Sequence, residues 1–294
     1  MRGAICQSRQ RSGIFFRILK WVTCIILLIA GGVVAIQDVL IFPAMVPSLW
    51  GVLDFQPPQD VEEFKVSTRD GAAVTVWGTK SAGGAVALIL HGNADLLPTV
   101  SHSMRFLAAR GIRSFAFDYR GLGETPGWPS EQRLYMDAEA ALENVAARTH
   151  VNPSDVVVIG YSIGTGPAAY LAQRYNTKKL FLFAPYYSLR DLVSARPVVG
   201  WLSPLLKYEF PTGRYLAATK GTEITLFHGL DDEVIPPAHS ERIVSELAPG
   251  TPRELLLVPG QNHNTIFGYG SLILVKKVLS AAAGLHGYQD SIGN

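Results

Sequence analysis

The strongest constraint on this sequence is a regular alternation of short apolar segments with longer amphipathic ones, which begins at Val61 and continues almost to the C-terminus. Most of the short segments are apolar along their length, as strands are when helices cover both faces of a parallel sheet. The segments between them have the periodicity of amphipathic helices. The alternation therefore predicts an α/β fold in which a mostly parallel sheet lies between helices.

Eight strands are predicted from this pattern, and the first two flank Arg69-Asp70-Gly71, a typical hairpin turn. The first strands are thus antiparallel and the later ones follow a β-α-β order. The predicted strands are residues 61–67, 74–79, 85–90, 114–118, 156–159, 179–184, 223–227 and 253–258. The predicted helices are residues 100–110, 131–148, 163–173, 237–248 and 272–285. Ligands of such sheets bind beyond the carboxyl ends of the strands, so functional residues are expected to follow strands.

A serine follows the fifth predicted strand in the sequence GYSIG, residues 160–164. Glycine on both sides allows a sharp, strained turn whose close neighbours leave no room for a Cβ atom. The G-x-S-x-G pattern between a strand and a helix is typical of a nucleophile elbow, which lifts Ser162 above the sheet edge. Because so short a pattern also occurs in ordinary glycine-rich connections, partners elsewhere in the chain must distinguish the two interpretations.

Candidate partners follow the seventh and eighth predicted strands. Asp231 and Asp232 lie in the loop after the seventh strand, and His263 lies in the loop after the eighth. The order serine, aspartate, histidine is the one found in α/β hydrolases. In such a constellation the imidazole accepts the serine proton, and the carboxylate holds the imidazole in the useful tautomer.

A tetrahedral intermediate also needs hydrogen-bond donors for its oxyanion. In this arrangement one donor is the backbone N–H of the residue after the nucleophile, here Ile163. The second donor comes from the loop after the third strand, here the sequence HGNADL at residues 91–96.

The N-terminal residues predict a membrane anchor. Residues 1–20 contain five basic and no acidic side chains, and an uncharged apolar stretch then extends to Ile36. Together with apolar residues upstream, this stretch approaches the roughly 20 residues that cross a bilayer. The positive-inside rule places the basic end in the cytoplasm and the rest of the chain on the extracytoplasmic side, the periplasm of a bacterium. A signal peptide cleaved near Ala35 is the alternative.

The chain is thus divided into a leader and anchor at residues 1–36, a proline-containing linker at 37–60 and a folded domain at 61–294. Beyond residue 20, 21 basic residues stand against 24 acidic ones, a balance that indicates no nucleic-acid partner. Both cysteines, Cys6 and Cys24, lie in the leader, so the sequence predicts neither a disulfide nor a cysteine metal ligand in the domain.

Residues 188–211, between the sixth and seventh predicted strands, are rich in apolar side chains interrupted by prolines. They predict a short cap with an apolar entrance suited to an acyl chain. The candidate substrate-binding residues in it are Leu192, Val193, Trp201 and Leu202. In the alternative interpretation these side chains only cover the sheet.

Several segments of the chain resemble small membrane-anchored α/β hydrolases of the serine aminopeptidase-like or depalmitoylase-like branch. They include LHGNA, GYSIGTGPAAYLA, HGLDDEVIP and GQNHN, and they span most of residues 40–265 in the family's order. The resemblance implies that Ser162 is the nucleophile, His263 the base and Asp232, rather than Asp231, the acid. It also implies that the backbone N–H of Asn93 is the second oxyanion donor.

The sequence therefore predicts an α/β-hydrolase fold, with an eight-stranded, mostly parallel sheet, a short cap and one N-terminal transmembrane helix. The predicted function is a serine hydrolase that cleaves acyl esters or thioesters through an acyl-enzyme, with no metal and no organic cofactor. Its expected partners are a small-molecule or lipid-like acyl substrate and the membrane. The alternatives are a peptidase or amidase and, from a different class, a membrane-tethered scaffold without turnover. The acyl group, the leaving group and the number of subunits stay open.

Overall fold

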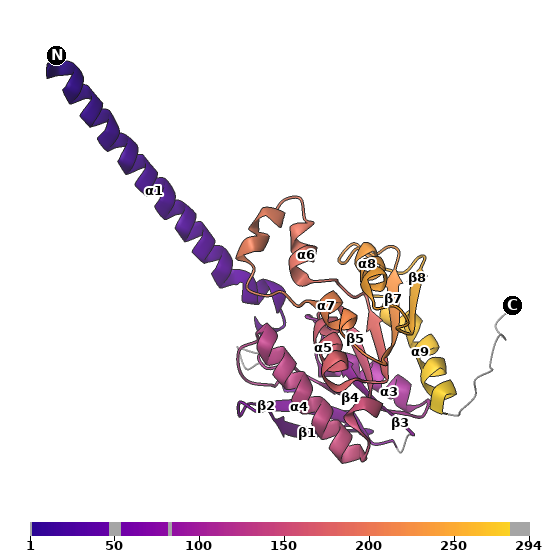
Figure 1. The fold of residues 1–294 in the computed structure, drawn as a ribbon. Coiled ribbons are helices and arrows are strands. Elements are labelled where there is room, and N and C mark those ends of the chain that lie inside the picture. Colours follow the sequence, from indigo (N-terminus) through magenta and orange to yellow (C-terminus); the bar gives the residue numbers. More distant parts are fainter. Residues whose placement is uncertain (1, 47–53, 82–83, 283–294) are drawn as a thin grey trace.

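In the computed structural model, an eight-stranded sheet forms the centre of the fold, with helices on both faces (Figure 1). The structure describes residues 2–46, 54–81 and 84–282. The strand order is β1-β2-β4-β3-β5-β6-β7-β8. β2 pairs antiparallel with both β1 and β4, and all other neighbours pair parallel. The predicted α/β-hydrolase fold is confirmed.

All eight predicted strands are found, with ends that differ by a few residues. The strands are β1 Val61–Ser67, β2 Ala73–Thr79, β3 Ala85–Leu90, β4 Ile112–Phe117, β5 Val157–Tyr161, β6 Lys179–Phe183, β7 Glu223–Gly229 and β8 Arg253–Val258. The helices are α1 Arg2–Ile41, α3 Leu97–Ala108, α4 Glu131–Thr149, α5 Thr165–Tyr175, α6 Leu189–Ser194, α7 Thr212–Ala217, α8 Ala238–Glu246 and α9 Ile266–Ala282. Three 3-10 turns are η1 Pro153–Asp155, η2 Ser162–Gly164 and η3 Gly200–Leu205.

The largest difference concerns α9, which begins at Ile266 instead of residue 272. Two glycines in its first turns, Gly268 and Gly270, lower the helix propensity of this segment. Tertiary packing explains why the helix forms nevertheless, because Gly270 lies so close to Phe183 and Phe227 that an added Cβ would collide with both rings. The predicted end of this helix at residue 285 lies outside the described residues.

The sheet separates two apolar clusters. Along β3, Leu88 and Leu90 face one cluster and Ala87 and Ile89 face the other, so the strand is buried on both sides. Side chains of α4, α5, α7 and α8 complete the first cluster, and side chains of α3 and α9 complete the second. This two-sided burial is the physical reason for the continuous apolar segments in the sequence.

The loop after β4 is fixed by buried charged side chains. Asp118 accepts a hydrogen bond from the backbone N–H of Leu97 at the start of α3, 3.0 Å away. The guanidinium of Arg120 binds the carboxylate of Asp137 on α4 and that of Asp70 in the β1–β2 turn, each at 2.6 Å. These contacts hold the loop after β4 against the start of α3, against α4 and against the β1–β2 turn.

Helix α1 projects away from the domain (Figure 1). Residues Leu19–Ile41 form a segment of 23 residues that is long and apolar enough to cross a membrane. The helix continues to Ile41, five residues beyond the predicted boundary at Ile36, and its last turns are held against the domain. Gln37 and Asp38 in these turns are buried.

Candidate active site

Ser162 lies at a sharp turn between β5 and α5. Its φ angle is +52°, a left-handed conformation that is strained for a residue with a Cβ atom. Gly160 and Gly164 allow the turn, because an added Cβ would collide with Ala168 at the first position and with the carbonyl group of Leu90 at the second. The turn thus has the strand-turn-helix geometry of a nucleophile elbow.

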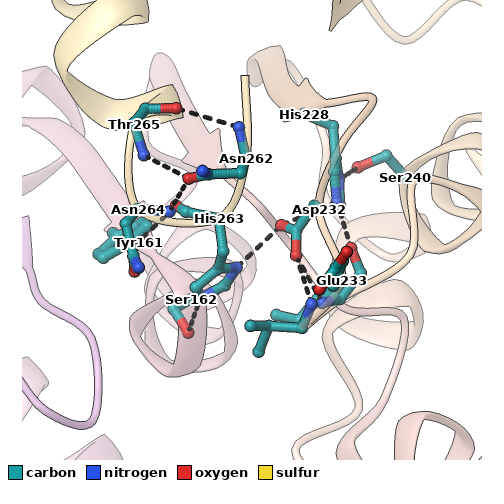
Figure 2. A network of polar contacts seen from close by, with 12 residues as sticks. Tyr161, Ser162, His228, Asp232, Glu233, Ser240, Asn262, His263, Asn264 and Thr265 are labelled. Carbon is teal, nitrogen blue, oxygen red and sulfur yellow. Dashed lines mark hydrogen bonds and ion pairs between the residues drawn. The ribbon is translucent and has the colours of Figure 1, made fainter. Parts of the chain in front are cut away.

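The side chains of Ser162, His263 and Asp232 form one chain of hydrogen bonds (Figure 2). Nε2 of His263 lies 3.1 Å from Oγ of Ser162, and Nδ1 lies 2.8 Å from Oδ2 of Asp232. Since a carboxylate only accepts, Nδ1 carries the proton in the neutral imidazole, and Nε2 is free to accept the serine O–H. Ser162 is 8 % exposed and His263 is 9 % exposed, so both side chains are largely shielded from water.

Both carboxylate oxygens of Asp232 accept hydrogen bonds. Oδ1 accepts the backbone N–H groups of Val234, at 2.9 Å, and Ile235, at 2.7 Å. Burial raises the pKa of this carboxyl, but hydrogen bonds from His228, His263 and the N–H of Ile235 outweigh burial and hold the pKa well below its usual range. Asp232 therefore stays ionised at neutral pH.

Asp231, the alternative acid, has an exposed side chain. Its backbone N–H donates to the carbonyl oxygen of Gln261, 3.0 Å away. The structure thus brings Asp232, and not Asp231, against His263.

His228 is completely buried beside Asp232 (Figure 2). Its Nε2 lies 2.7 Å from the carbonyl oxygen of Ile235, so Nε2 carries a proton and Nδ1 accepts the hydroxyl of Ser240, 2.6 Å away. Nε2 also lies 3.5 Å from Oδ2 of Asp232. His228 thus orders the acidic loop and has both of its nitrogens occupied.

Two further residues fix the loop that carries His263. The hydroxyl of Tyr161 donates to the backbone carbonyl of His263 at 2.9 Å (Figure 2). The side-chain oxygen of Asn262 accepts the N–H groups of Asn264 and Thr265, at 3.0 and 3.2 Å. Neither residue was predicted from the sequence. Asn262 has a local signal, because asparagine commonly bonds to backbone two residues on, whereas nothing in the sequence marks Tyr161 as a partner of His263.

The candidate oxyanion donors lie on two adjacent loops. In the parallel pair β3–β5, Leu90 aligns with Gly160, and Asn93 and Ile163 each stand three residues beyond that pair. A Cβ atom added to Gly164 would collide with the carbonyl group of Leu90, so the two loops approach each other closely. The hydroxyl of Tyr186 donates to the carbonyl oxygen of Ile163 at 3.0 Å and helps to orient this turn.

The four candidate substrate-binding residues occupy different environments in the cap. Leu192 and Val193 on α6 and Leu202 on η3 are half-buried, and Leu192 packs against the core cluster that contains Ile163. Trp201 is 72 % exposed, and its indole N–H donates to the carbonyl oxygen of Val198 in the cap itself. The cap therefore presents Leu192 to the interior and Trp201 to the exterior.

A cavity of about 430 Å³ lies next to the hydrogen-bonded chain, on the side of α3 and α9. Tyr161 and Asn264, the neighbours of Ser162 and His263 in the sequence, line it together with His91, Asp95 and Phe267. Within residues 2–46, 54–81 and 84–282, no three histidine, cysteine or acidic side chains are grouped as metal ligands would be.

Comparisons with known proteins find related sequences and a shared fold. Residues 81–225 match the family model described as serine aminopeptidase, S33. An uncharacterized protein of Mycobacterium tuberculosis is 31% identical over 253 residues, which cover 83% of this chain and 87% of that protein. Human alpha/beta hydrolase domain-containing protein 17B is 30% identical over 220 residues, 72% of this chain and 73% of that protein. The solved structure of the esterase Pf2001 from Pyrococcus furiosus shares the fold, with a TM-score of 0.63 at 18% identity over 78% of this chain and 94% of that one.

Proposed function

We propose that this chain, which belongs to the α/β hydrolases, is a serine hydrolase that cleaves acyl esters or thioesters. The observation that carries this proposal is the hydrogen-bonded chain from Ser162 through His263 to Asp232, built on a strained elbow. A buried hydroxyl, an imidazole and an ionised carboxylate in this order are the parts that acyl transfer requires.

In the proposed reaction, Oγ of Ser162 attacks the carbonyl carbon of the substrate while Nε2 of His263 takes the hydroxyl proton. Asp232 stabilises the imidazolium that forms. The backbone N–H groups of Ile163 and Asn93 donate to the oxyanion of the tetrahedral intermediate. The intermediate collapses when His263 returns the proton to the leaving alcohol or thiol, and an acyl ester of Ser162 results.

Water completes the cycle. His263 removes a proton from a water molecule, which attacks the acyl carbonyl and forms a second tetrahedral intermediate. The protonated imidazole then returns its proton to Oγ of Ser162 as the carboxylic acid leaves. Each proton transfer and each charge in these reaction steps is assigned to a group of the protein. The proposal therefore includes no metal or organic cofactor.

The apolar cap supports an acyl substrate, with Leu192, Val193 and Leu202 as candidate contacts along the chain and Trp201 at its outer edge. Esterase activity in the fold neighbour from Pyrococcus furiosus is consistent with this choice. The second candidate is a peptidase or amidase, which the family description favours. The same three side chains would serve it, with an amine as the leaving group. A membrane-tethered scaffold without turnover is the third.

We further propose that α1 anchors the protein in a membrane, with its basic N-terminal end in the cytoplasm and the hydrolase domain on the extracytoplasmic side. In this proposal residues 1–36 are leader and anchor and residues 61–294 are the domain, with the cap at 188–211. Within the predicted linker 37–60, residues 37–41 continue α1 and bind the cap. Cleavage near Ala35 is the alternative, and it would release the domain.

The test is a panel of matched substrates with one acyl chain and an oxygen, sulfur or nitrogen leaving atom, offered to the wild-type chain and to Ser162→Ala. We expect turnover of the ester and thioester that Ser162→Ala lacks. Faster turnover of the amide would favour the peptidase candidate. Folded wild-type protein that turns over none of the panel would favour the scaffold.

A further inference from the structure

The cap has an exposed apolar edge. Its members are Val198, Val199, Trp201 and Leu205, of which Val198 is 80 % exposed and Trp201 72 %. We call these four residues the cap edge. Four large apolar side chains within eight residues are unusual on a surface that faces water, and such groups mark contact sites.

The cap edge is joined to the last turns of α1 (Figure 1). The side-chain amide of Gln37 donates to the carbonyl oxygen of Leu205 at 2.9 Å, and its oxygen accepts the N–H of Lys207 at 2.8 Å. Asp38 adds an ion pair with Lys207, at 3.2 Å, and a hydrogen bond from the hydroxyl of Tyr208. These partners are more than 160 residues apart in the sequence, so they fix the helix to the cap and not to a neighbouring turn.

The length of the apolar segment then places the cap relative to a bilayer. The part of the apolar segment that precedes the cap contacts, Leu19–Ile36, has 18 residues and extends for about 27 Å as a helix, close to the about 30 Å of a hydrocarbon core. Gln37 and Asp38, which bind the cap, follow directly, and Leu40 is still 68 % exposed. There is thus no spacer between the membrane-spanning segment and the domain.

The same end of α1 also contacts the candidate site. The side-chain amide of Asn93, in the candidate oxyanion loop, donates to the carbonyl oxygen of Ile41 at 3.1 Å. On the other side, Arg196 of the cap donates to the carbonyl oxygens of Glu233 and Val234, just after Asp232. The helix end, the cap and two loops of the site therefore form one connected unit.

The side chains around this unit are those typical of a membrane interface. Trp128 is exposed and its indole N–H donates to Asp38 at 2.9 Å. Trp201 belongs to the cap edge, and Lys207 follows the last member of the cap edge, Leu205, by two residues in the sequence. Tryptophan and lysine are enriched where protein meets lipid headgroups, because each combines an apolar body with a polar end.

We propose that the cap edge enters the surface of the same bilayer that α1 crosses, so that the cap side of the candidate site faces the lipid. The substrate then reaches the site from the membrane, as an acyl ester or thioester whose chain is dissolved in the bilayer. The inference rests on the proposed function for its substrate, but the membrane contact itself is measured without turnover.

The contact is tested on the full chain reconstituted in phosphatidylcholine vesicles. In a Cys6→Ser, Cys24→Ser background, single cysteines replace Val198 on the cap edge, Ile26 in α1 and Lys220 in the α7–β7 loop, and each carries an environment-sensitive fluorophore. We expect lipids with a spin label on the acyl chain to quench the probes at 26 and 198, and aqueous iodide to quench the probe at 220. Quenching by lipid at 26 with quenching by iodide at 198 overturns the inference and leaves the anchor intact. Quenching by iodide at both 26 and 198 overturns the anchor and the inference together.

Substrate delivery is tested with the Val198→Ser, Val199→Ser double variant. We expect about a tenfold lower rate on 4-nitrophenyl palmitate in the vesicles, because two apolar side chains no longer stabilise the contact with lipid. The rate on 4-nitrophenyl acetate in water should stay within about twofold of wild type, since surface substitutions rarely disturb the fold. Equal rates of variant and wild type on both esters would contradict delivery from the membrane. No turnover of either ester by wild type would instead contradict the proposed function and leave the quenching result standing.

Discussion

The hydroxyl of Tyr161 donates a hydrogen bond to the backbone carbonyl of His263, 2.9 Å away, and the two rings lie with their centroids 5.5 Å apart. Tyr161 is the residue before Ser162, so this contact ties the serine turn to the loop that carries the imidazole. The distance between Oγ of Ser162 and Nε2 of His263 depends on how these two loops are held. Tyr161 is thus a positioning residue for the pair.

Replacement of Tyr161 by phenylalanine should loosen this positioning. The ring stays and the hydrogen bond is lost, so we expect kcat for an ester to fall about tenfold, with KM within about twofold. Steady-state kinetics of the variant measure both constants. Tyr175→Phe is the matched control, since its hydroxyl binds Glu143 far from the site, and it should leave kcat unchanged. An unchanged kcat in Tyr161→Phe would show that the loops are held without this bond.

Asp232→Asn should reduce kcat by about four orders of magnitude, because the amide favours the wrong imidazole tautomer and leaves the imidazolium without a counter-charge. Asp231→Asn is the matched control, since its side chain is exposed, and it should keep most of the wild-type activity. Circular dichroism checks that both variants are folded. The opposite ranking of the two variants would assign the acid to Asp231.

The pH dependence of stability follows from the lowered pKa of Asp232. A carboxylate whose pKa is lower in the folded than in the unfolded chain, where it is about 3.9, stabilises the fold fully above the unfolded value. It loses this contribution progressively as the pH falls from there through the lower folded value. The difference in free energy of unfolding between wild type and Asp232→Asn should therefore be constant near neutral pH and shrink below about pH 4. Urea unfolding in detergent at a series of pH values measures it. A difference that grows toward acid pH would contradict the lowered pKa.

Gly164→Ala should disturb the serine turn, because the added Cβ would collide with the carbonyl group of Leu90 and force the loops after β3 and β5 apart. We expect a loss of about 2 kcal/mol or more in the free energy of unfolding, together with a large loss of turnover. Gly84→Ala is the control, since open space surrounds its Cβ position. Equal stability of the two variants would show that the serine turn accommodates a Cβ atom at position 164 and would contradict this expectation.

The strands could be predicted because β3 and its parallel neighbours are buried on both faces, which leaves a continuous apolar signal in the sequence. The start of α9 could not, because Gly268 and Gly270 weaken the helix propensity and only packing against Phe183 and Phe227 restores the helix. The end of α1 at Ile41 could not be predicted either, because it depends on the contacts of Gln37 and Asp38 with the distant cap.

Within the candidate site, the chain order of serine, aspartate and histidine was visible in the sequence. The choice between Asp231 and Asp232 needed the resemblance to a family, because two adjacent carboxylates give the same order. Tyr161 was missed because its partner is 102 residues away and the contact exists only in the folded chain. The exposure of Trp201 was also not visible in the sequence, since a buried and an exposed apolar side chain look alike there.

Covalent labelling of the wild-type chain by a fluorophosphonate, followed by mass spectrometry of its peptides, tests directly whether Ser162 is an activated nucleophile. We predict one labelled peptide, modified at Ser162, no labelling in Ser162→Ala, and labelling at least about a thousandfold slower in His263→Ala. Both variants should remain folded, as judged by circular dichroism. Folded wild-type protein that is labelled elsewhere, or that no fluorophosphonate labels, would contradict the assignment of Ser162 as the nucleophile.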